Sequence, residues 1–563
     1  MEPRLFLRNL KNRKIKAVAL VAFLSLYFIL SCSIALKKSN TFDEPGHILA
    51  GYAYLKEGMD FLATLDHPIM GRVPMAFFPA IFLDLDFNPE VRPLMSDDSD
   101  FYPHSLKFLF ENKVDGQRIL FLSRLGNIML GVVLGVYVFL WGDRLWGVKG
   151  AVFSLFAYSL YPDILAHSGI STTDFPLATF FFIAAYYLWR TLNEGLKTRL
   201  VVLAGVFTGL GLATKHTAIL LLVFSIPVFI YSFRRQRKSN FFLKAVIFAA
   251  FIYLTIWAVY GFRYSSESLF YEGLLWDRIS GPWVVNVFAV LRSLKALPEA
   301  YLYSFASAIA SAGAGRASFL MGEYSIEGWW YYFIVTFLIK TPVPITLFMI
   351  AAIAYSLKER ALFFKTAALF APALIIFIFV SMQTVNIGHR YLLSAYPFIF
   401  ALIGMVPGIK TKSLTTARIV IAGFSLWFVY GAFSIHPHEL AYFNEFIGGP
   451  ANGYKYLVDS NIDWGQDLTG LKEYMDKNNI KTVKLAYFGF SDPSYYGIDY
   501  EYLPSYAINE PKNAKPRIEL EGWFAISATM LQGVYLIDRD FYRVFRESEP
   551  VEKIGYSIFI FRL

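Results

Sequence analysis

The chain has 563 residues, of which 56% are apolar and 17% are charged, against about 25% charged residues in an average soluble protein. A soluble chain of this length could not bury so much apolar surface in ordinary cores. Because there is one cysteine and no glycine period, the disulfide-rich and collagen-like classes are also excluded. The composition therefore predicts a protein that crosses a membrane several times.

Eleven apolar segments are candidates for spanning the hydrocarbon core, which needs about 20 residues. The first is expected to be an uncleaved anchor helix, because it is longer than the apolar part of a signal peptide and lacks a small-residue cleavage site. The predicted spans lie near residues 17–36, 118–142, 148–166, 174–190, 200–213, 216–233, 242–260, 333–356, 363–381, 391–406 and 416–435. The expected fold class is an all-α polytopic membrane protein.

Positive charge is unevenly distributed among the connecting segments. With the N-terminus in the cytoplasm, the segments on that side carry 22 Lys and Arg but four acidic residues, a net charge of +18, while the rest of the chain nets −9. This asymmetry follows the positive-inside rule, so the net charge of +9 indicates orientation rather than a nucleic-acid partner. The orientation places two long loops, 37–117 and 261–327, on the external side, and all eight histidines there or at its membrane edge.

The end of the chain differs in character from the rest. From Asp459 it becomes hydrophilic, with a helical pattern at 466–474. Short β-rich runs follow at 483–488, 524–529, 534–537 and 556–561. We therefore expect a transmembrane domain at 1–435 and a small external α/β domain at 436–563.

The first external loop opens with two carboxylates, Asp43 and Glu44, followed by Pro45. The pattern predicts a short helix on the membrane surface, in which Asp43 and His47 would share a face. Asp43 could cap this helix, or it could act as a general base with Glu44 in support. The spacing leaves both roles open, and they are compatible because a capping carboxylate is held in place.

Several other charged residues are expected at the same membrane edge. Arg124 lies just inside the second span, where a guanidinium is costly unless it meets an anion, faces a polar cavity or extends to the head groups. Asp174 begins the fourth span and could cap it or form an acidic pair with Asp43. Further positive charge on this side comes from Lys215, Arg390 and Lys340. Lys340 precedes Thr341-Pro342, where a proline is expected to open the helix.

Carboxylates that face cations at a membrane edge suit transfer from a lipid phosphate. The leaving phosphate is already anionic, so it needs charge compensation more than an acid. A transporter would instead have ionisable residues at the midplane and an internal two-fold symmetry, and the sequence shows neither. A flippase or transporter of lipid-linked sugars is the alternative from another class, and a polymerase or ligase of envelope glycans is the alternative within the same class.

The order of these motifs resembles the glycosyltransferase C superfamily, and more narrowly the protein O-mannosyltransferases and lipid A aminoarabinose transferases. The motifs are Asp43-Glu44-Pro45, His67-Pro68, Ser123-Arg124, Thr172-Thr173-Asp174, Thr214-Lys215, Gly322-Glu323, Lys340-Thr341-Pro342 and Asn386-Ile387-Gly388-His389-Arg390-Tyr391. The stretch from Tyr442 to Asp467 looks like that of uncharacterised bacterial members. The resemblance covers most of the chain.

The resemblance implies an inverting enzyme that moves a sugar from a polyprenyl-phosphate donor to a glycan, lipid or protein acceptor on the external face. Asp43 would be the catalytic base, and Glu44 and Asp174 would orient the acceptor or the sugar. The candidate ligands of the donor phosphate are Arg124, Lys215, Arg390 and Lys340, and the further site candidates are His67, His389 and Glu323.

Further expectations concern the acceptor, the cofactors and the location of the protein. The sequence has no obvious β-trefoil insertion, so a protein acceptor is in doubt, and the C-terminal domain could either bind the acceptor or cap the cavity. No metal or other cofactor is expected, because this subgroup generally requires none and His436 and His438 form only a weak ligand pair. A bacterial inner membrane, with the C-terminal domain in the periplasm, is the expected location.

Overall fold

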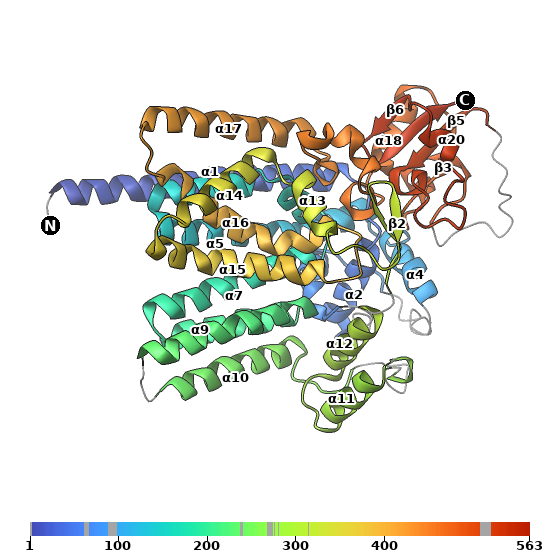
Figure 1. Ribbon diagram of the computed structural model, residues 1–563. Coiled ribbons are helices and arrows are strands. Elements are labelled where there is room, and N and C mark those ends of the chain that lie inside the picture. The colour runs from blue at the N-terminus through green and yellow to red at the C-terminus, as the bar shows by residue number, and fades with distance from the viewer. Residues whose placement is uncertain are drawn as a thin grey trace.

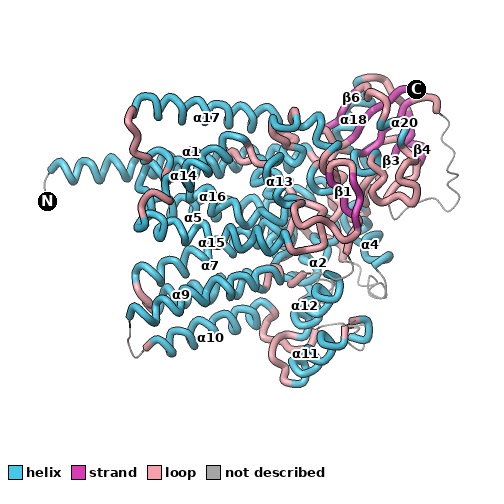
Figure 2. The backbone as a smooth tube through the Cα atoms, viewed as in Figure 1, coloured by secondary structure: helices cyan, strands magenta, loops and turns pink. Residues whose placement is uncertain are grey.

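The computed structural model describes residues 3–60, 67–87, 98–236, 240–266, 274, 276–279, 281–312, 315–506 and 520–563. Long helices form a bundle, and a mixed α/β domain lies at one end of it (Figure 1). Figure 2 shows that strands are concentrated near the C-terminus, whereas the bundle is helical throughout. The predicted combination of a helical membrane part and a small C-terminal α/β domain is confirmed.

The bundle contains all eleven predicted apolar segments. Its helices are α1 (Pro3–Lys37), α5 (Gly116–Ser159), α6 (Pro162–Ser168), α7 (Asp174–Glu194), α8 (Thr198–Leu212), α9 (Leu220–Gln236), α10 (Phe241–Val259), α13 (Tyr332–Lys340), α14 (Val343–Ser356), α15 (Arg360–Ser381), α16 (Tyr396–Ile403) and α17 (Leu414–Ile435), with 3-10 turns η4 (His216–Ile219) and η6 (His389–Ala395). Among the described residues, seven helices are long and apolar enough to cross a membrane, or eight if α13 and α14 form one bent span. The multi-pass character is therefore confirmed, and the number eleven stays a prediction.

Two breaks in the bundle have clear local causes. The spans predicted at 118–142 and 148–166 run into each other as α5, which bends at Gly147, where φ is +70° and a glycine is favoured. Helices α13 and α14 meet at an angle of 110° around Thr341-Pro342, because proline cannot donate the hydrogen bond that would continue the helix. The proline break predicted after Lys340 is thus present.

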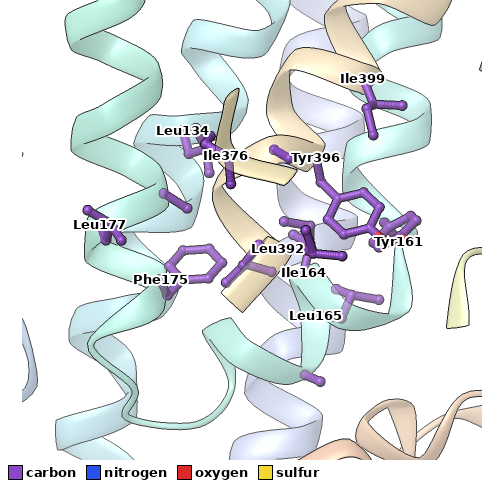
Figure 3. Close-up of a cluster of buried hydrophobic side chains, with 14 of the residues drawn as sticks. Leu134, Tyr161, Ile164, Leu165, Phe175, Leu177, Ile376, Leu392, Tyr396 and Ile399 are labelled. Carbon is purple, nitrogen blue, oxygen red and sulfur yellow. The ribbon is translucent and has the colours of Figure 1, made fainter. Parts of the chain in front are cut away.

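A buried cluster fixes the helix ends that carry the site residues. Figure 3 shows Phe175 of α7 next to Leu392 of η6, in a cluster that also contains Leu177 of α7, Ile376 of α15 and Tyr396 of α16. Each of these side chains is at most 7% exposed. Inside a bilayer such contacts stabilise through close packing rather than through exclusion of water. They hold the start of α7 beside η6, and so bring Asp174 close to Arg390.

Shorter elements cover the end of the bundle nearest the α/β domain (Figure 1). They are α2 (Glu44–Glu57), η2 (Ile69–Gly71), α3 (Val73–Phe82), α4 (Asp98–Phe110), η5 (Trp276–Arg278), α11 (Pro282–Ser293), α12 (Glu299–Ala312) and the antiparallel strands β1 (Ser318–Leu320) and β2 (Glu323–Ser325). The helix predicted after Asp43 is present as α2. It is not a surface helix, however, because residues 44–53 are buried on every side and α2 packs against α3 and α4.

The C-terminal domain contains a five-stranded sheet with strand order β4-β3-β5-β7-β6. Strand β3 is parallel to β4 and β5, and β7 is antiparallel to β5 and β6. The elements are η8 (Glu439–Ala441), η9 (Glu445–Ile447), η10 (Pro450–Lys455), η11 (Asp459–Asn461), α18 (Leu468–Lys477), β3 (Thr482–Ala486), η12 (Pro493–Tyr496), β4 (Asp499–Tyr502), β5 (Trp523–Ser527), α19 (Ala528–Leu531), α20 (Arg543–Arg546), β6 (Glu552–Ile554) and β7 (Ile558–Arg562).

Three of the four predicted β-rich runs coincide with β3, β5 and β7. The run at 534–537 is wrong: it is a turn that follows α19 and Gly533, whose φ is +68°. The short outer strands β4 and β6 were not predicted, because edge strands with exposed polar residues carry little apolar alternation.

Candidate functional site

Asp43 precedes α2 and directs its carboxylate away from that helix. It occupies the N-cap position, but its side chain makes no capping hydrogen bond. Its Oδ2 instead accepts a hydrogen bond from Nη1 of Arg390 at 3.3 Å. The Asp43 side chain is 24% exposed and that of Arg390 is 10% exposed. The carboxylate is therefore held by an ion pair and is still accessible.

The Arg390 guanidinium is incompletely bonded. Its Nε is buried and has no hydrogen-bond partner in the described part of the chain. Its Nη1 lies 3.8 Å from Oδ2 of Asp174, which is too far for a hydrogen bond. Charge-assisted pairs usually measure about 2.7–2.9 Å, and buried N–H groups are nearly always bonded. This cation is thus able to take an additional anionic ligand.

A second ion pair lies beside the first. Asp174 is the first residue of α7, and its Oδ1 accepts a hydrogen bond from Nζ of Lys215 at 2.6 Å. Its Oδ2 is buried and has no hydrogen-bond partner among the described residues. Nζ of Lys215 also lies 5.1 Å from the centre of the Tyr391 ring. Together the two pairs contain two carboxylates and two cations, so their formal charges cancel.

A small cavity of about 30 Å³ lies beside the second pair, between α7, α9 and α15. Asp174, Lys215 and Tyr391 line its polar end. The rest of its lining is mostly apolar and consists of Leu177, Phe181, Thr217, Leu220, Ile376, Phe379, Val380 and Ser394. This space is about that of one water molecule, so the cavity marks where the Lys215 cation meets an apolar surface and does not itself enclose a lipid chain.

Glu44, the neighbour of Asp43, forms a different kind of pair. Its oxygens accept hydrogen bonds from Nε and Nη2 of Arg124 at 2.8 and 2.7 Å, and from the backbone N–H groups of Thr41 and Ser171, both at 2.7 Å. Burial alone would raise the pKa of Glu44, but Arg124 and these hydrogen bonds hold it below its usual value. Both side chains of the pair are fully buried.

Arg124 donates its remaining N–H groups to backbone carbonyls. Nη1 bonds the oxygens of Ala35 and Lys38, and Nη2 bonds that of Ser39, each at 2.8 Å. Counting the two bonds to Glu44, all five donors of the guanidinium are used. This differs from the predicted contact with a donor phosphate, which would require breaking the network. The contacts of Arg124 instead fix the turn between α1 and α2.

Lys340 also directs its charge into the protein. Its Nζ donates to the carbonyl oxygens of Leu440 at 2.8 Å and Asn461 at 2.6 Å, and it lies 3.7 Å from Oδ1 of Asp163. The side chain is 1% exposed. The predicted phosphate contact of Lys340 therefore has no support in this geometry, because its donors serve to join α13 to the segments that follow α17.

His389 lies one residue before Arg390 but faces another way. Its imidazole nitrogens are within hydrogen-bond distance of the hydroxyls of Thr336 and Tyr396, at 3.0 and 2.6 Å. His67 lies near enough to Asp174 to interact with its carboxylate electrostatically. Glu323 is exposed on strand β2 and takes part in none of the contacts described above. The structure thus groups His67 with Asp174 but does not bring His389 or Glu323 to the two pairs.

Three residues beside the pairs were not predicted as site residues. Asp459 adopts a left-handed φ of +57°, its carboxylate accepts a hydrogen bond from Tyr535, and burial raises its pKa. Arg316 interacts electrostatically with Asp459 and Asp43. The ring of Trp464 lies over the Arg390 guanidinium, 4.2 Å from its Cζ. The sequence gives one weak indication of a role for Arg316, which is a cation among the small residues of the stretch 311–317.

Among the residues that the structure describes, no group of three or more His, Cys, Asp or Glu side chains could hold a metal ion.

Part of this chain matches a known family. Residues 113–259, which include Arg124, Asp174 and Lys215, match the family described as dolichyl-phosphate-mannose-protein mannosyltransferase. No curated protein matches the chain. Over residues 113–259 the match agrees with the predicted resemblance to the protein mannosyltransferases, a class of membrane glycosyltransferase.

Several solved structures are similar in outline. ArnT from Cupriavidus metallidurans, bound to undecaprenyl phosphate, has a TM-score of 0.46 and 11% identity over 97% of each chain. The oligosaccharyltransferase AglB from Archaeoglobus fulgidus, in complex with an inhibitory peptide and a dolichol-phosphate, has a TM-score of 0.45 and 13% identity over 82% of this chain and 59% of that one. The Saccharomyces cerevisiae Pmt1-Pmt2 complex, bound to the sugar donor, has a TM-score of 0.31 and 16% identity over 44% and 33%. All three scores are below 0.5, so the residue roles proposed below rest on contacts within this chain.

Proposed function

We propose that the protein transfers a sugar from a polyprenyl-phosphate donor to an acceptor hydroxyl on the external side of the membrane. The observation that carries this proposal is the incompletely bonded Arg390, next to Lys215 at the polar end of an apolar cavity. A phosphodiester on a hydrocarbon chain supplies what these groups lack, because its oxygens satisfy the cations and its chain can lie against the apolar side chains beside them. The mannosyltransferase family match supports the same class of donor.

Asp43 is the base in this proposal. Its carboxylate takes the proton of the acceptor hydroxyl while the acceptor oxygen forms a bond to the anomeric carbon of the sugar. The bond from that carbon to the phosphate oxygen breaks, and its electron pair stays on the phosphate. Direct displacement inverts the configuration at the anomeric carbon. A positioned general base typically contributes a factor of about 10²–10⁴ to the rate.

The charges of the site favour this step. The donor brings one negative charge to two pairs whose formal charges already cancel. During transfer the phosphate gains one negative charge as the diester becomes a monoester, and Asp43 loses one by accepting the proton. The total charge therefore stays constant in a partly buried site, where an uncompensated charge is costly. Arg390 already contacts Asp43. When Asp43 accepts the proton and loses its charge, the Arg390 guanidinium can therefore shift its contact to the phosphate, which has gained a charge.

The orientation also enters the proposal. The C-terminal domain and α2, which directly follows Asp43, lie at one end of the bundle (Figure 1). The end of α9, the start of α10, and the turns that connect α14 to α15 and α16 to α17 lie at the other end. The Lys and Arg excess predicted for the cytoplasm falls on the second group. We therefore assign the site and residues 436–563 to the external side, which is the periplasm if the host is a bacterium.

The test uses purified full-length protein and its Asp43→Asn variant with a panel of polyprenyl-phosphate sugars and an envelope lipid extract as the source of acceptor. We expect the wild type to release free polyprenyl phosphate from one donor and the variant to release it at least about 100-fold more slowly. Asp143→Asn is the matched control, because Asp143 pairs with Lys16 in α1, away from Asp43, and should leave the release unchanged. Movement of lipid-linked sugar across vesicles without release would contradict the proposal and support a transporter.

A further inference from the structure

One loop of the C-terminal domain contacts both members of the Asp43–Arg390 pair. Trp464 lies in this loop and is 2% exposed. Its ring centre is 4.2 Å from Cζ of Arg390. Its carbonyl oxygen accepts a hydrogen bond of 2.9 Å from the N–H of Phe42, the residue before Asp43. A single residue thus joins the segment that carries the carboxylate to the side chain of the cation.

The loop is anchored to the turn that carries Arg390. Oδ1 of Asn461 accepts a hydrogen bond of 2.8 Å from the backbone N–H of His389. The hydroxyl of Ser460 donates to the carbonyl oxygen of Ile387 at 2.9 Å. Nζ of Lys340, which the sequence suggested for the phosphate, donates to the carbonyl oxygen of Asn461. The position of the loop relative to η6 is therefore fixed from several sides.

The following residues are anchored to the segment before Asp43. The backbone N–H of Ser39 donates to the carbonyl oxygen of Gln466, and its hydroxyl donates to that of Gly465, both at 3.0 Å. Lys38 forms a buried ion pair with Asp467. The stretch from Ser460 to Asp467 thus holds the carboxylate segment and the cation segment at a set separation.

We infer that Trp464 is a positioning residue of the transferase site, and that the C-terminal domain is a built-in part of this site rather than a separate module for the acceptor. This inference rests on the proposed function. Arg390 has few hydrogen bonds to fix the plane of its guanidinium, and the indole ring supplies that restraint by stacking on one face. The N–H groups at the edge of the guanidinium are then directed at Asp43 and at the place of the donor phosphate.

The experiment compares Trp464→Met, which removes the ring, with Trp464→Phe, which keeps one. Trp523→Met is the matched control, because Trp523 stacks on Arg562 in the same domain at 5.2 Å and contacts neither pair. Farnesyl phosphate serves as the binding probe, and release of polyprenyl phosphate gives KM and kcat. We expect Trp464→Met to weaken farnesyl phosphate binding and raise the donor KM about tenfold, a size typical of a desolvated cation–π contact. Trp464→Phe should recover most of the loss, and Trp523→Met should change neither quantity.

A double-mutant cycle separates positioning from general packing. In an Arg390→Gln background, Trp464→Met should cause no further loss of farnesyl phosphate binding, because the group that it positions is gone. An equal loss in both backgrounds, or wild-type binding by a folded Trp464→Met protein, would overturn the inference.

Two further outcomes are informative. If Trp464→Met does not fold, fluorinated tryptophan at position 464 weakens the interaction with the cation at nearly constant shape, and binding should then fall stepwise with fluorination; constant binding would contradict the inference. If the wild type itself does not bind farnesyl phosphate, the proposed function and this inference both fail. Wild-type binding that is insensitive to Trp464 removes only the inference.

Discussion

Two neighbouring carboxylates in this protein meet two arginines in opposite ways. Glu44 and Arg124 are fully buried, pair through two short hydrogen bonds, and have every remaining donor of the arginine bonded to backbone carbonyls. Asp43 and Arg390 are partly exposed, pair through one hydrogen bond of 3.3 Å, and leave a buried N–H without a partner. We call the first the inner pair and the second the outer pair.

The difference shows how a functional ion pair can be told from a structural one. An arginine whose donors are all bonded has none left for a ligand. Breaking its ion pair would leave a buried charge without a partner, which is strongly destabilising. An arginine with an incomplete set of partners can exchange them at low cost. The inner pair therefore fixes the turn between α1 and α2, and the outer pair at the edge of that turn is available for chemistry.

The largest effect is expected from breaking the inner pair. Arg124→Leu leaves the Glu44 carboxylate buried and unpaired, which should lower the free energy of unfolding by about 3–5 kcal/mol. Thermal unfolding and the yield of monodisperse protein measure this loss. The double variant Arg124→Leu, Glu44→Leu should recover part of it, and a single variant as stable as the wild type would contradict the structural role.

Removing the charge of the outer carboxylate should affect the reaction and spare the fold. Asp43→Asn is expected to lower kcat by a factor of about 10²–10⁴, with a change in the free energy of unfolding below about 1 kcal/mol, as for partly exposed ion pairs. Release of polyprenyl phosphate and thermal unfolding on the same sample measure both quantities. A large loss of stability with normal turnover would show that Asp43 has a structural role, like the residues of the inner pair.

The outer cation should act mainly through donor affinity. Arg390→Gln removes a charged donor for the phosphate, and such hydrogen bonds contribute about 1.5–3 kcal/mol. The donor KM should therefore rise about 10- to 100-fold. Steady-state kinetics at varied donor concentration test this, with Arg124→Lys as the comparison at the inner pair. An unchanged donor KM in Arg390→Gln would remove Arg390 from the phosphate site.

The smallest effect is expected from an ion pair at the opposite end of the bundle. Lys16 and Asp143 pair at 2.7 Å with side chains that are 34% and 23% exposed. Lys16→Gln should change the free energy of unfolding by less than about 1 kcal/mol and leave transfer unchanged. A strong effect on transfer would show that the outer pair is sensitive to distant charges, and would weaken the comparison.

The sequence predicted the helical membrane part well, because apolar segments of sufficient length have few alternatives in a bilayer. It also placed Asp43, Asp174, Lys215 and Arg390 on one side, and the structure brings them together. What it could not show is which cations already have partners. Arg124 looked like a phosphate ligand because a guanidinium inside a span needs an anion, and the anion turned out to be Glu44.

The contribution of the C-terminal domain was equally hidden in the sequence. Trp464 is separated by more than 400 residues from Phe42, whose N–H it bonds, and no local pattern reveals such a pairing. The contacts of Lys340 were not visible in the sequence for the same reason, because its partners Leu440 and Asn461 are 100 and 121 residues away. Local patterns specify elements and membrane sides, whereas the bonding state of a charged group depends on distant segments.

The most direct test of the central claim is the affinity of farnesyl phosphate for the wild type, Asp43→Asn and Glu44→Gln, each checked for folding. Asp43 and a phosphate compete for Arg390 in this account, so Asp43→Asn should bind the probe at least as tightly as the wild type while its rate of sugar transfer falls by a factor of about 10²–10⁴. Glu44→Gln should lose stability, because its pair is structural. Weaker probe binding by a folded Asp43→Asn protein, or sugar transfer by that variant at close to the wild-type rate, would contradict the account.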